Sequence, residues 1–293
     1  MKEIENLFLP PKNFAGLSSP FADIENARVA ILPVPYDGTT EWHGGTREGP
    51  RAIIEASTYL ELFDMELKQE IYLMGIHTLP ELQPVLSNPE SMIYNVYLAT
   101  KNIVKQDKFP VMFGGEHSLS LGAVQALKEK YNDMSVLHMD AHADLREEYM
   151  GTKFNHACTM RRILEYCPIT QVGIRSLSKE EHGFIRMNKM ILFEMSTLRD
   201  NQKIVFDIVN SLSNNIYVSI DLDVFDPSIM SAVATPEPDG MLWSNSLKLL
   251  KAVAVKKNII GFDLMELCPQ EGPAACAYTA AKLAYKLIGY SLL

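Results

Sequence analysis

The stretch SVLHMDAHAD (135–144) joins a short apolar run to a regularly spaced polar one. His138, Asp140, His142 and Asp144 occupy every second position of it. An apolar run of this length is typical of a strand buried on both faces, as in parallel sheets covered by helices. In such sheets ligands bind beyond the carboxyl ends of the strands. The stretch therefore predicts an α/β fold with a functional site where this strand ends.

The same alternation of apolar runs and helical patterns continues along the chain, without an internal repeat or a long linker. Strands are predicted at 28–34, 110–115, 135–140, 170–175, 190–194, 216–223 and 258–267. Helices are predicted at about 48–63, 91–106, 118–131, 157–166, 178–188, 198–213, 244–256 and 274–290. We expect one α/β domain over residues 1–293 with a mainly parallel central sheet.

Composition narrows the class of protein. The chain has 293 residues, of which 47% are hydrophobic, and a net charge of −9. Such a chain lacks the basic surface that nucleic acids or anionic membranes require, whereas a small cationic substrate would be attracted. The N-terminus shows no signal peptide, no run is long enough to span a membrane, and the four cysteines form no Cys-x-x-Cys pair. These features predict a cytoplasmic protein without a thiolate zinc site.

Four predicted strands end in residues that an apolar sheet does not need for packing. They are His117 after 110–115, Asp140, His142 and Asp144 after 135–139, Asp221, Asp223 and Asp226 after 216–220, and Asp263 and Glu266 near the end of 258–267. Because parallel strands end at the same edge of a sheet, we expect these side chains to converge.

Each residue alone also has an ordinary explanation. An Asp after a strand commonly caps a helix or forms a turn, and Asp226 precedes a proline. Asp263 could be a group at the sheet edge or a helix cap. His138 lies inside the apolar run, which favours a core histidine.

Taken together, the residues predict a binuclear metal site. Asp140, Asp144, Asp221 and Asp223 would carry four negative charges into a small space, and two divalent cations would balance them. Carboxylates with two imidazoles and no thiolate suit Mn²⁺ best, with Fe, Co or Zn possible. The Gly-Asp-x-x-Asp and Gly-Asn-His motifs of metallophosphoesterases and the His-x-His of amidohydrolase barrels are missing.

The motifs GGEHS (114–118), DAHAD (140–144) and SIDLDVFDP (219–227) resemble the three metal signatures of the ureohydrolase family of arginases and agmatinases. The resemblance covers nearly the whole chain. The family's N-terminal region is similar to PVPYDGTT (33–40) and GTREGPRAI (45–53), and its later motifs are similar to TPEPDG (235–240) and GFDLMEL (261–267). It implies a three-layer α/β/α sandwich and a homo-oligomer, either a trimer or a hexamer.

Carried over residue by residue, the resemblance implies two Mn²⁺ per subunit. One ion would be bound by His117, Asp140, Asp144 and Asp221, and the other by Asp140, His142, Asp221 and Asp223. Catalytic roles fall to His156, Glu266 and Asp144, and substrate contacts to Thr235 and Glu266.

The implied reaction is hydrolysis of a guanidino compound. A hydroxide bridging the two metals would attack the guanidinium carbon, Glu266 would pair with the guanidinium nitrogens, and His156 would protonate the leaving amine. Structural roles for Glu266 and His156, as an ion-pair partner and a surface residue, are the alternatives.

The substrate best matching the sequence is agmatine, which would give putrescine and urea and place the enzyme in polyamine biosynthesis. The loop 145–155 lacks the polar groups with which arginases hold an amino-acid head, and Glu147 in it would favour an amine. Glu147 could equally be a solvated charge, and Lys153 in the same loop opposes the acidic argument.

Some positions depart from the agmatinase pattern. Glu116 replaces an Asp, Ala232-Val233-Ala234 replaces Gly-Thr-Gly, and Asp239 replaces a Gly. Aminopropylagmatine, guanidinobutyrate and arginine are therefore alternative substrates. A catalytically silent, metal-binding relative and a one-zinc deacetylase-like hydrolase are the alternatives from other classes.

Overall fold

The computed structural model describes residues 9–198 and 202–293. Residues 1–8, on which the prediction of no signal peptide partly rests, lie outside the described residues. So do residues 199–201, which belong to the helix predicted at 198–213.

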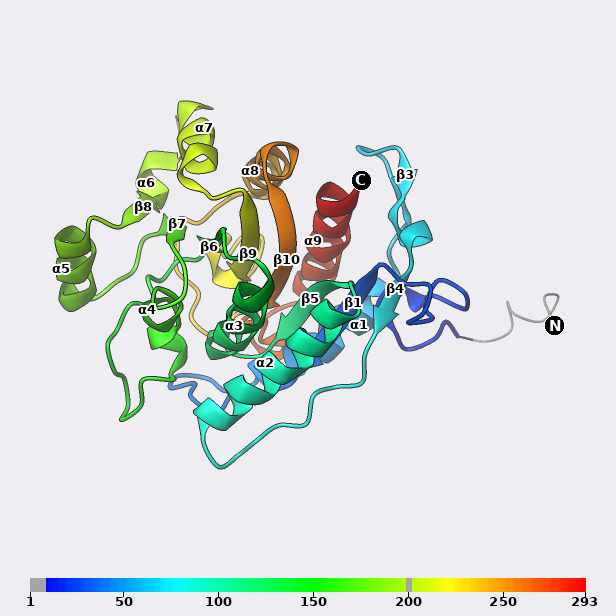
Figure 1. The fold of residues 1–293 in the computed structure, drawn as a ribbon, viewed down its shortest axis with the longest axis horizontal. Helices are drawn as coiled ribbons and strands as arrows, with labels where there is room; N and C mark the ends of the chain where they lie inside the picture. The colour runs from blue at the N-terminus through cyan, green and yellow to red at the C-terminus, as the bar shows by residue number, and fades with distance from the viewer. Residues whose placement is uncertain (1–8, 199–201) are drawn as a thin grey trace.

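An eight-stranded parallel sheet forms the centre of the molecule, with the strand order β4-β1-β5-β10-β9-β6-β7-β8 (Figure 1). The strands are β1 (Val29–Val34), β4 (Ile76–Thr78), β5 (Phe109–Gly114), β6 (Met134–Met139), β7 (Ile169–Ile174), β8 (Ile191–Glu194), β9 (Asn215–Asp221) and β10 (Asn258–Met265). Every pair of neighbours in it is parallel. The predicted α/β fold with a mainly parallel sheet is confirmed. A separate antiparallel pair, β2 (Phe63–Asp64) and β3 (Gln69–Glu70), was not predicted.

Helices cover both faces of the sheet. They are α1 (Gly49–Ser57), α2 (Pro89–Lys105), α3 (Ser120–Lys130), α4 (Thr159–Ile163), α5 (Lys179–Asn188), α6 (Met195–Leu198), α7 (Gln202–Ser211), α8 (Trp243–Lys256) and α9 (Ala275–Leu292). Short 3₁₀ helices are η2 (Phe14–Gly16), η3 (Thr46–Glu48), η4 (Ile71–Met74), η5 (His117–Leu119), η6 (His156–Cys158), η7 (Leu222–Val224) and η8 (Pro269–Glu271).

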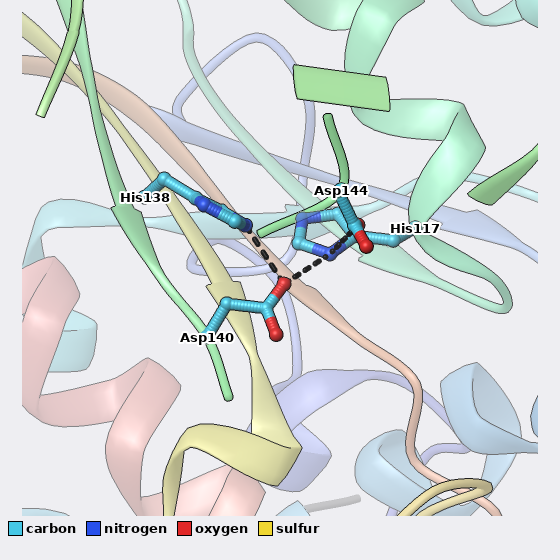
Figure 2. A group of neighbouring side chains, drawn as sticks. All are labelled: His117, His138, Asp140 and Asp144. Atoms are coloured by element: carbon cyan, nitrogen blue, oxygen red, sulfur yellow. Dashed lines mark hydrogen bonds and ion pairs between the residues drawn. The ribbon is translucent and has the colours of Figure 1, made fainter. Parts of the chain in front are cut away.

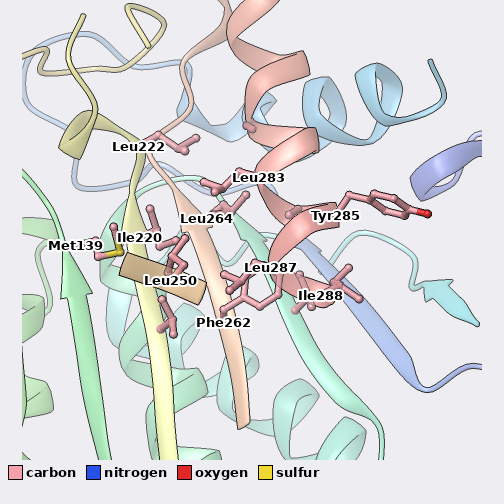
Figure 3. Packing of buried hydrophobic residues seen from close by; sticks show 14 of the residues in the cluster. Met139, Ile220, Leu222, Leu250, Phe262, Leu264, Leu283, Tyr285, Leu287 and Ile288 are labelled. Carbon is pink, nitrogen blue, oxygen red and sulfur yellow. The ribbon is translucent and has the colours of Figure 1, made fainter. Parts of the chain in front are cut away.

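Two hydrophobic cores, one on each face, make the three layers. Alternate residues of β1 point to opposite faces: Val29 and Ile31 join the core under α1, α8 and α9, whereas Ala30 and Leu32 join the core under α2, α3 and α4. Figure 3 shows the first core, where side chains of β6, β9 and β10 pack against α8 and α9. Burial on both faces explains why the strands read as continuous apolar runs.

Two predicted helices are shorter in the structure. The helix predicted at 48–63 ends at Ser57, where the hydroxyl of Ser57 donates to the carbonyl of Ile54 at 2.6 Å and turns follow. The helix predicted at 157–166 is a 3₁₀ turn, η6, followed by the five-residue α4. None of the helices among the described residues is long and apolar enough to cross a membrane.

Candidate metal centre and active site

The four middle strands, β5, β10, β9 and β6, deliver the predicted polar residues to one edge of the sheet. His117 begins η5 just after β5, Asp140 follows β6, Asp221 ends β9, and Glu266 follows β10. The register pairs Asp221 with Met265 and Met139 with Ile220, so these strand ends are level with one another. These residues converge as predicted, whereas Asp226 does not join them, because its carboxylate accepts hydrogen bonds from Ser228 and Gly240.

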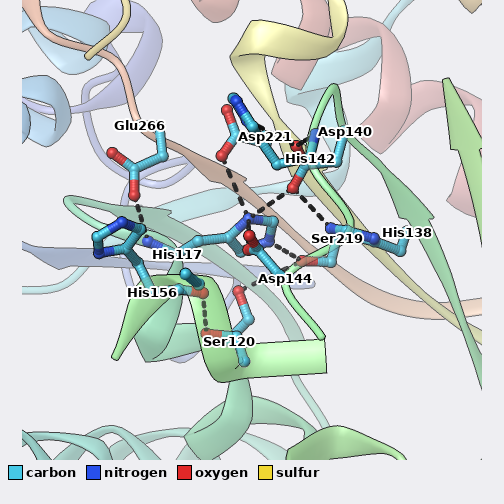
Figure 4. A network of polar contacts seen from close by, with 12 residues as sticks. His117, Ser120, His138, Asp140, His142, Asp144, His156, Ser219, Asp221 and Glu266 are labelled. Carbon is cyan, nitrogen blue, oxygen red and sulfur yellow. Dashed lines mark hydrogen bonds and ion pairs between the residues drawn. The ribbon is translucent and has the colours of Figure 1, made fainter. Parts of the chain in front are cut away.

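His117 lies at the centre of a first group of carboxylates (Figures 2 and 4). Its Nδ1 is 3.2 Å from Asp140 Oδ2, 3.2 Å from Asp221 Oδ2 and 3.5 Å from Asp144 Oδ2. One ligand atom each from His117, His138, Asp140 and Asp144 lie within 4.8 Å of one another, close enough to hold one ion.

A second group shares Asp140 with the first. His142 Nδ1 lies 2.8 Å from Asp223 Oδ2 and 3.7 Å from Asp140 Oδ1, and these three residues also have ligand atoms within 4.8 Å of one another. Asp221 accepts a hydrogen bond from the backbone N–H of Asp223 at 2.9 Å, and the carboxylate of Asp223 accepts one from the backbone N–H of Ala141 at 3.0 Å. A carboxylate common to two groups is the arrangement expected of a bridging ligand.

Polar residues behind the centre orient the imidazole of His117. His117 Nε2 is 2.8 Å from the hydroxyl oxygen of Ser219, which itself donates to Asp263 at 2.9 Å. A proton on Nε2 leaves the lone pair of His117 Nδ1 facing the carboxylates, and that buried atom has no hydrogen-bond partner among the described residues. Asp263, at 0% exposure inside β10, is thus a buried support of His117 and not a sheet-edge or capping group. His142 Nε2 lies 3.8 Å from Glu237, which was not predicted.

The carboxylates are crowded enough to need compensation. Burial and the charge of Asp140 hold the pKa of Asp144 well above its usual range. Burial, Asp223 and Asp140 do the same to the pKa of Asp221. Divalent cations would remove this repulsion, and a set of oxygen and imidazole donors without thiolate fits Mn²⁺ and its neighbours. The residues therefore form two candidate metal sites that fit a binuclear centre.

The surroundings of His138 are those expected of a core histidine. It is fully buried in β6, with Nε2 2.8 Å from Asp140 Oδ2 and Nδ1 3.0 Å from the Gln171 amide. Burial lowers its pKa, so the ring is neutral and both nitrogens have partners. Its contact with Asp140 orients that carboxylate.

A pocket of about 260 Å³ opens over the two metal sites. Its lining residues include the buried His117, Asp144, Asp221 and Glu266 at one end and the more exposed Glu41, Trp42, Arg146 and Tyr149 at the other. His142, His156 and Thr235 also line it. Asp144 and Glu266 both have left-handed backbones, with φ of 53° and 66°. Left-handed residues other than glycine are uncommon and concentrate at functional sites.

Glu266 and His156 both reach this pocket (Figure 4). Glu266 Oε1 accepts the backbone N–H of His117 at 2.6 Å, and burial together with the charges of Asp221 and Glu116 raises the pKa of Glu266. Burial lowers the pKa of His156 to about 4, so its imidazole is neutral near pH 7. A neutral, half-buried imidazole that lines the pocket can accept a proton and pass it on.

Thr235 lies in the pocket at the end of the segment that departs from the agmatinase pattern. Its hydroxyl is 3.4 Å from Asp223 Oδ2. Ala232, Val233 and Ala234 are buried, and Ala232 accepts the backbone N–H of Cys268 at 2.8 Å. Ala232 and Val233 therefore pack in the core beside Cys268 and Leu267, and Ala234 offers the pocket a methyl group instead of a hydroxyl.

Glu147 is the candidate that the structure does not bring to the pocket. It is a partly exposed residue that pairs with Lys153, Arg161 and Arg162 at 3.1, 2.9 and 3.1 Å. Three cations compensate its charge, and it does not line the pocket.

Sequence reasoning missed the acidic and hydroxyl groups of the loop after β1. Glu41 lines the pocket and accepts a short hydrogen bond from the Tyr149 hydroxyl. Thr39 contacts both Glu116 and His156. This loop follows β1, which ends at the same edge of the sheet. The rule that ligands bind beyond the carboxyl ends of parallel strands would therefore have included it.

The chain is similar to a family of known proteins. The model of the Arginase family matches residues 27–289. The N(1)-aminopropylagmatine ureohydrolase of a Synechocystis species is 35% identical over 288 residues, covering 96% of this chain and 94% of that protein. The agmatinase of Pyrococcus horikoshii is 34% identical, covering 93% and 95% of the two chains.

The fold agrees with a solved structure across its whole length. The crystal structure of agmatine ureohydrolase of Thermoplasma volcanium superposes with a TM-score of 0.87 and 30% identity, covering 99% of this chain and 97% of the other.

Proposed function

The chain belongs to the arginase family and is a metal-dependent ureohydrolase of a guanidino compound, and from this premise we propose that its substrate is agmatine, which it splits into putrescine and urea. The observation that supports the proposal is one pocket with two candidate metal sites and Glu266 at its buried end and a carboxylate, Glu41, at its exposed end. A guanidinium and a terminal ammonium would each meet an acidic group.

We propose that the centre takes two Mn²⁺, and that Asp140 and Asp221 would contribute to holding both. His117 and Asp144 complete one ligand set, and His142 and Asp223 complete the other. When bound, such ions supply a water of lowered pKa and stabilise the charge that develops on the substrate.

The side chains of this protein orient the substrate and move its proton. Glu266 would pair with two guanidinium nitrogens, because a planar guanidinium matches a carboxylate in two parallel hydrogen bonds. This pairing would hold the central carbon at the end of the pocket that Asp221 and His117 line. His156 enters the reaction as a neutral imidazole, takes up one proton and delivers it to the leaving amine, which departs as putrescine.

Glu41 is the residue that would select for a cationic tail. It is exposed at the open end of the pocket, where Tyr149 donates to its carboxylate. Arg146 also lines the pocket, with its guanidinium over the Tyr149 ring at 4.4 Å. Stacking on Tyr149 leaves the N–H groups of Arg146 free in the guanidinium plane, so Arg146 is the group that a carboxylate tail would meet, whereas Glu41 favours the ammonium of agmatine.

N(1)-aminopropylagmatine is the second candidate substrate. The observation that favours it is the 35% identity to an N(1)-aminopropylagmatine ureohydrolase that covers 96% of this chain. Its extra aminopropyl arm would extend beyond Glu41 toward the exposed Trp42.

The test is urea release by the purified, Mn²⁺-loaded protein, offered agmatine, N(1)-aminopropylagmatine, guanidinobutyrate and arginine at equal concentrations. We expect the highest kcat/KM with agmatine, and putrescine as the co-product. A higher kcat/KM with N(1)-aminopropylagmatine would select the second candidate. Urea from neither, with two metals bound, would overturn both.

A further inference from the structure

We propose that Thr39, fixed in place by Glu116, positions His156 so that the proton of its neutral ring sits on Nδ1 and Nε2 is free to handle protons in the pocket. The inference rests on the proposed role of His156 and adds two residues that act through it. Neither Thr39 nor Glu116 touches the substrate in this scheme, so both are positioning residues.

Glu116 holds Thr39 by both its backbone and its side chain. The backbone N–H of Thr39 donates to Glu116 Oε2 at 2.6 Å, and the Thr39 hydroxyl donates to Glu116 Oε1 at 2.8 Å. The hydroxyl of Ser118 donates to Oε1 as well. Glu116 is fully buried, so these hydrogen bonds form away from water, where each is electrostatically stronger.

Thr39 in turn holds His156 at two points. Its hydroxyl oxygen accepts the backbone N–H of His156 at 3.1 Å and lies 3.2 Å from the ring Nδ1. The amide of Asn155 donates to the Thr39 carbonyl at 3.3 Å, which attaches the start of η6 to the same residue.

The number of protons decides the tautomer. A threonine hydroxyl has one proton and two acceptor sites, and the carboxylate of Glu116, in its ionised form, accepts the hydrogen bond from that proton. The contact between Thr39 Oγ1 and His156 Nδ1 can then be a hydrogen bond only if Nδ1 is the donor. A neutral ring with its proton on Nδ1 has an unprotonated Nε2. This is the arrangement of a base whose orientation is set by a third group.

The backbone explains why Thr39 and Glu116 meet. The loops after β1 and β5 run together, with the N–H of Gly115 donating to Val34 and that of Glu116 donating to Tyr36, at 3.0 and 2.9 Å. A Cβ at position 115 would overlap the carbonyl of Tyr36, so only glycine permits this approach. The contact between Thr39 and Glu116 is therefore built into the fold.

The experiment compares Thr39→Val, which removes the hydroxyl at nearly constant volume, with Thr39→Ser, which keeps it. We expect Thr39→Val to lower kcat by about 10- to 100-fold with KM within about threefold, the scale of a misplaced proton-transfer group. Thr39→Ser should recover most of the loss. Both proteins should bind as many metal ions per chain as the parent.

A second readout does not depend on turnover. Solid-state ¹⁵N NMR of histidine-labelled, Zn²⁺-loaded protein reports which ring nitrogen is protonated, and the signal missing from His156→Gln identifies residue 156. The parent and Thr39→Ser should show a protonated Nδ1, and Thr39→Val should lose that preference. Thr40→Val is the matched control: its hydroxyl is buried without a hydrogen-bond partner among the described residues, so the tautomer should match the parent.

Three outcomes would overturn the proposal. They are a Thr39→Val protein that keeps the Nδ1 proton, a Thr39→Ser protein as impaired as Thr39→Val, or loss of bound metal in Thr39→Val, because the contacts described do not reach the ligands. If no guanidine yields urea, the NMR comparison still decides the positioning of His156, so the two proposals fail separately.

Discussion

The carboxylate of Glu266 and the backbone N–H of His117 are joined by a 2.6 Å hydrogen bond. The proposed guanidinium partner, which follows β10, is thereby fixed to the proposed metal ligand that follows β5. The left-handed backbone of Glu266, with φ of 66°, allows its side chain to turn back toward this contact. One short contact therefore sets the distance between the substrate-binding group and the metal centre.

Replacing Glu266 by Gln should separate binding of the guanidinium from binding of metal. The amide keeps the size of the side chain but removes the charge that a guanidinium needs. We expect kcat/KM for agmatine to fall by about 100-fold or more, on the scale of losing an electrostatic contact at a reaction centre. Metal content should stay at two ions per chain, measured by mass spectrometry of the element. Glu129→Gln, at an exposed residue of α3, is the control and should behave as the parent. Loss of metal from Glu266→Gln would show a structural role instead.

The two metal sites should respond unequally to loss of their ligands. Asp140 belongs to both candidate groups, whereas Asp223 belongs to one. We expect Asp140→Asn to bind less than one ion per chain and Asp223→Asn to bind about one, with urea release lost in both. Asp107→Asn, at an exposed residue paired with Lys130, should keep two ions. Equal metal content in Asp140→Asn and Asp223→Asn would contradict the shared role of Asp140.

Chelation of the ions should also destabilise the fold. A ligand that binds only the folded state at 100 times its Kd adds about 2.7 kcal/mol to the free energy of unfolding. We expect a lower Tm after dialysis against a chelator and recovery on addition of Mn²⁺. A Tm independent of metal would mean that the carboxylates are compensated without it.

The lowered pKa of the half-buried His156 predicts a specific acid sensitivity. Burial lowers its pKa from 6.5 to about 4, so between these values the unfolded chain binds a proton that the folded protein does not. The stability from this group is therefore present above about pH 6.5 and lost as the pH falls toward 4, by up to about 3 kcal/mol. The free energy of unfolding of the metal-free parent, measured by urea denaturation, should fall by up to about 3 kcal/mol relative to that of His156→Asn as the pH falls through this range. A difference between the two proteins that does not change with pH would contradict a neutral imidazole at position 156 of the folded protein.

The same variant should show what His156 does in turnover. His156→Asn should lower kcat for agmatine by about 100-fold or more, the contribution typical of a general acid or base. Its metal content should equal that of the parent, because His156 is in neither ligand group. A fall in metal content would assign His156 to metal binding.

Glu41 and Arg146 should have opposite effects on substrate choice. Glu41→Gln should raise KM for agmatine and N(1)-aminopropylagmatine by about tenfold, as expected for about 1.4 kcal/mol of lost ion pairing, and leave guanidinobutyrate nearly unaffected. Arg146→Gln should affect any activity toward guanidinobutyrate more than that toward agmatine. Equal changes in KM for all substrates in both variants would show that neither residue contacts the end of the substrate opposite the guanidinium.

The positions of the strand-end residues were predictable because each follows an apolar run that forms a buried strand. An apolar run followed by Asp140, Asp144 or Asp221 can place those carboxylates only at a sheet edge, and the structure has them there. Helix ends were less predictable, since the limits of α1 and α4 depend on turns that tertiary contacts stabilise. β4 was missed because it has three residues and lies at the edge of the sheet, where little apolar surface is required.

The remaining site residues depend on contacts that sequence spacing does not encode. Glu147 and Glu41 are both loop glutamates, yet Glu147 pairs with three cations and Glu41 lines the pocket. Glu116 differs from the expected Asp, and only the structure shows that its carboxylate reaches Thr39. Thr39 and Glu116 are 77 positions apart, so their pairing follows from the fold and not from local pattern.

The position of β10 has a consequence for biosynthesis. It is the last strand of the chain to be made, yet it lies between β5 and β9 in the middle of the sheet. A nascent chain that has not yet released residues 258–265 from the ribosome holds two half-sheets, each with an unpaired apolar edge at β5 or β9. Exposed edges of this kind invite pairing with other chains. Chaperone dependence and aggregation of truncated chains should thus be greatest just before β10 emerges, and metal loading should follow the completion of synthesis.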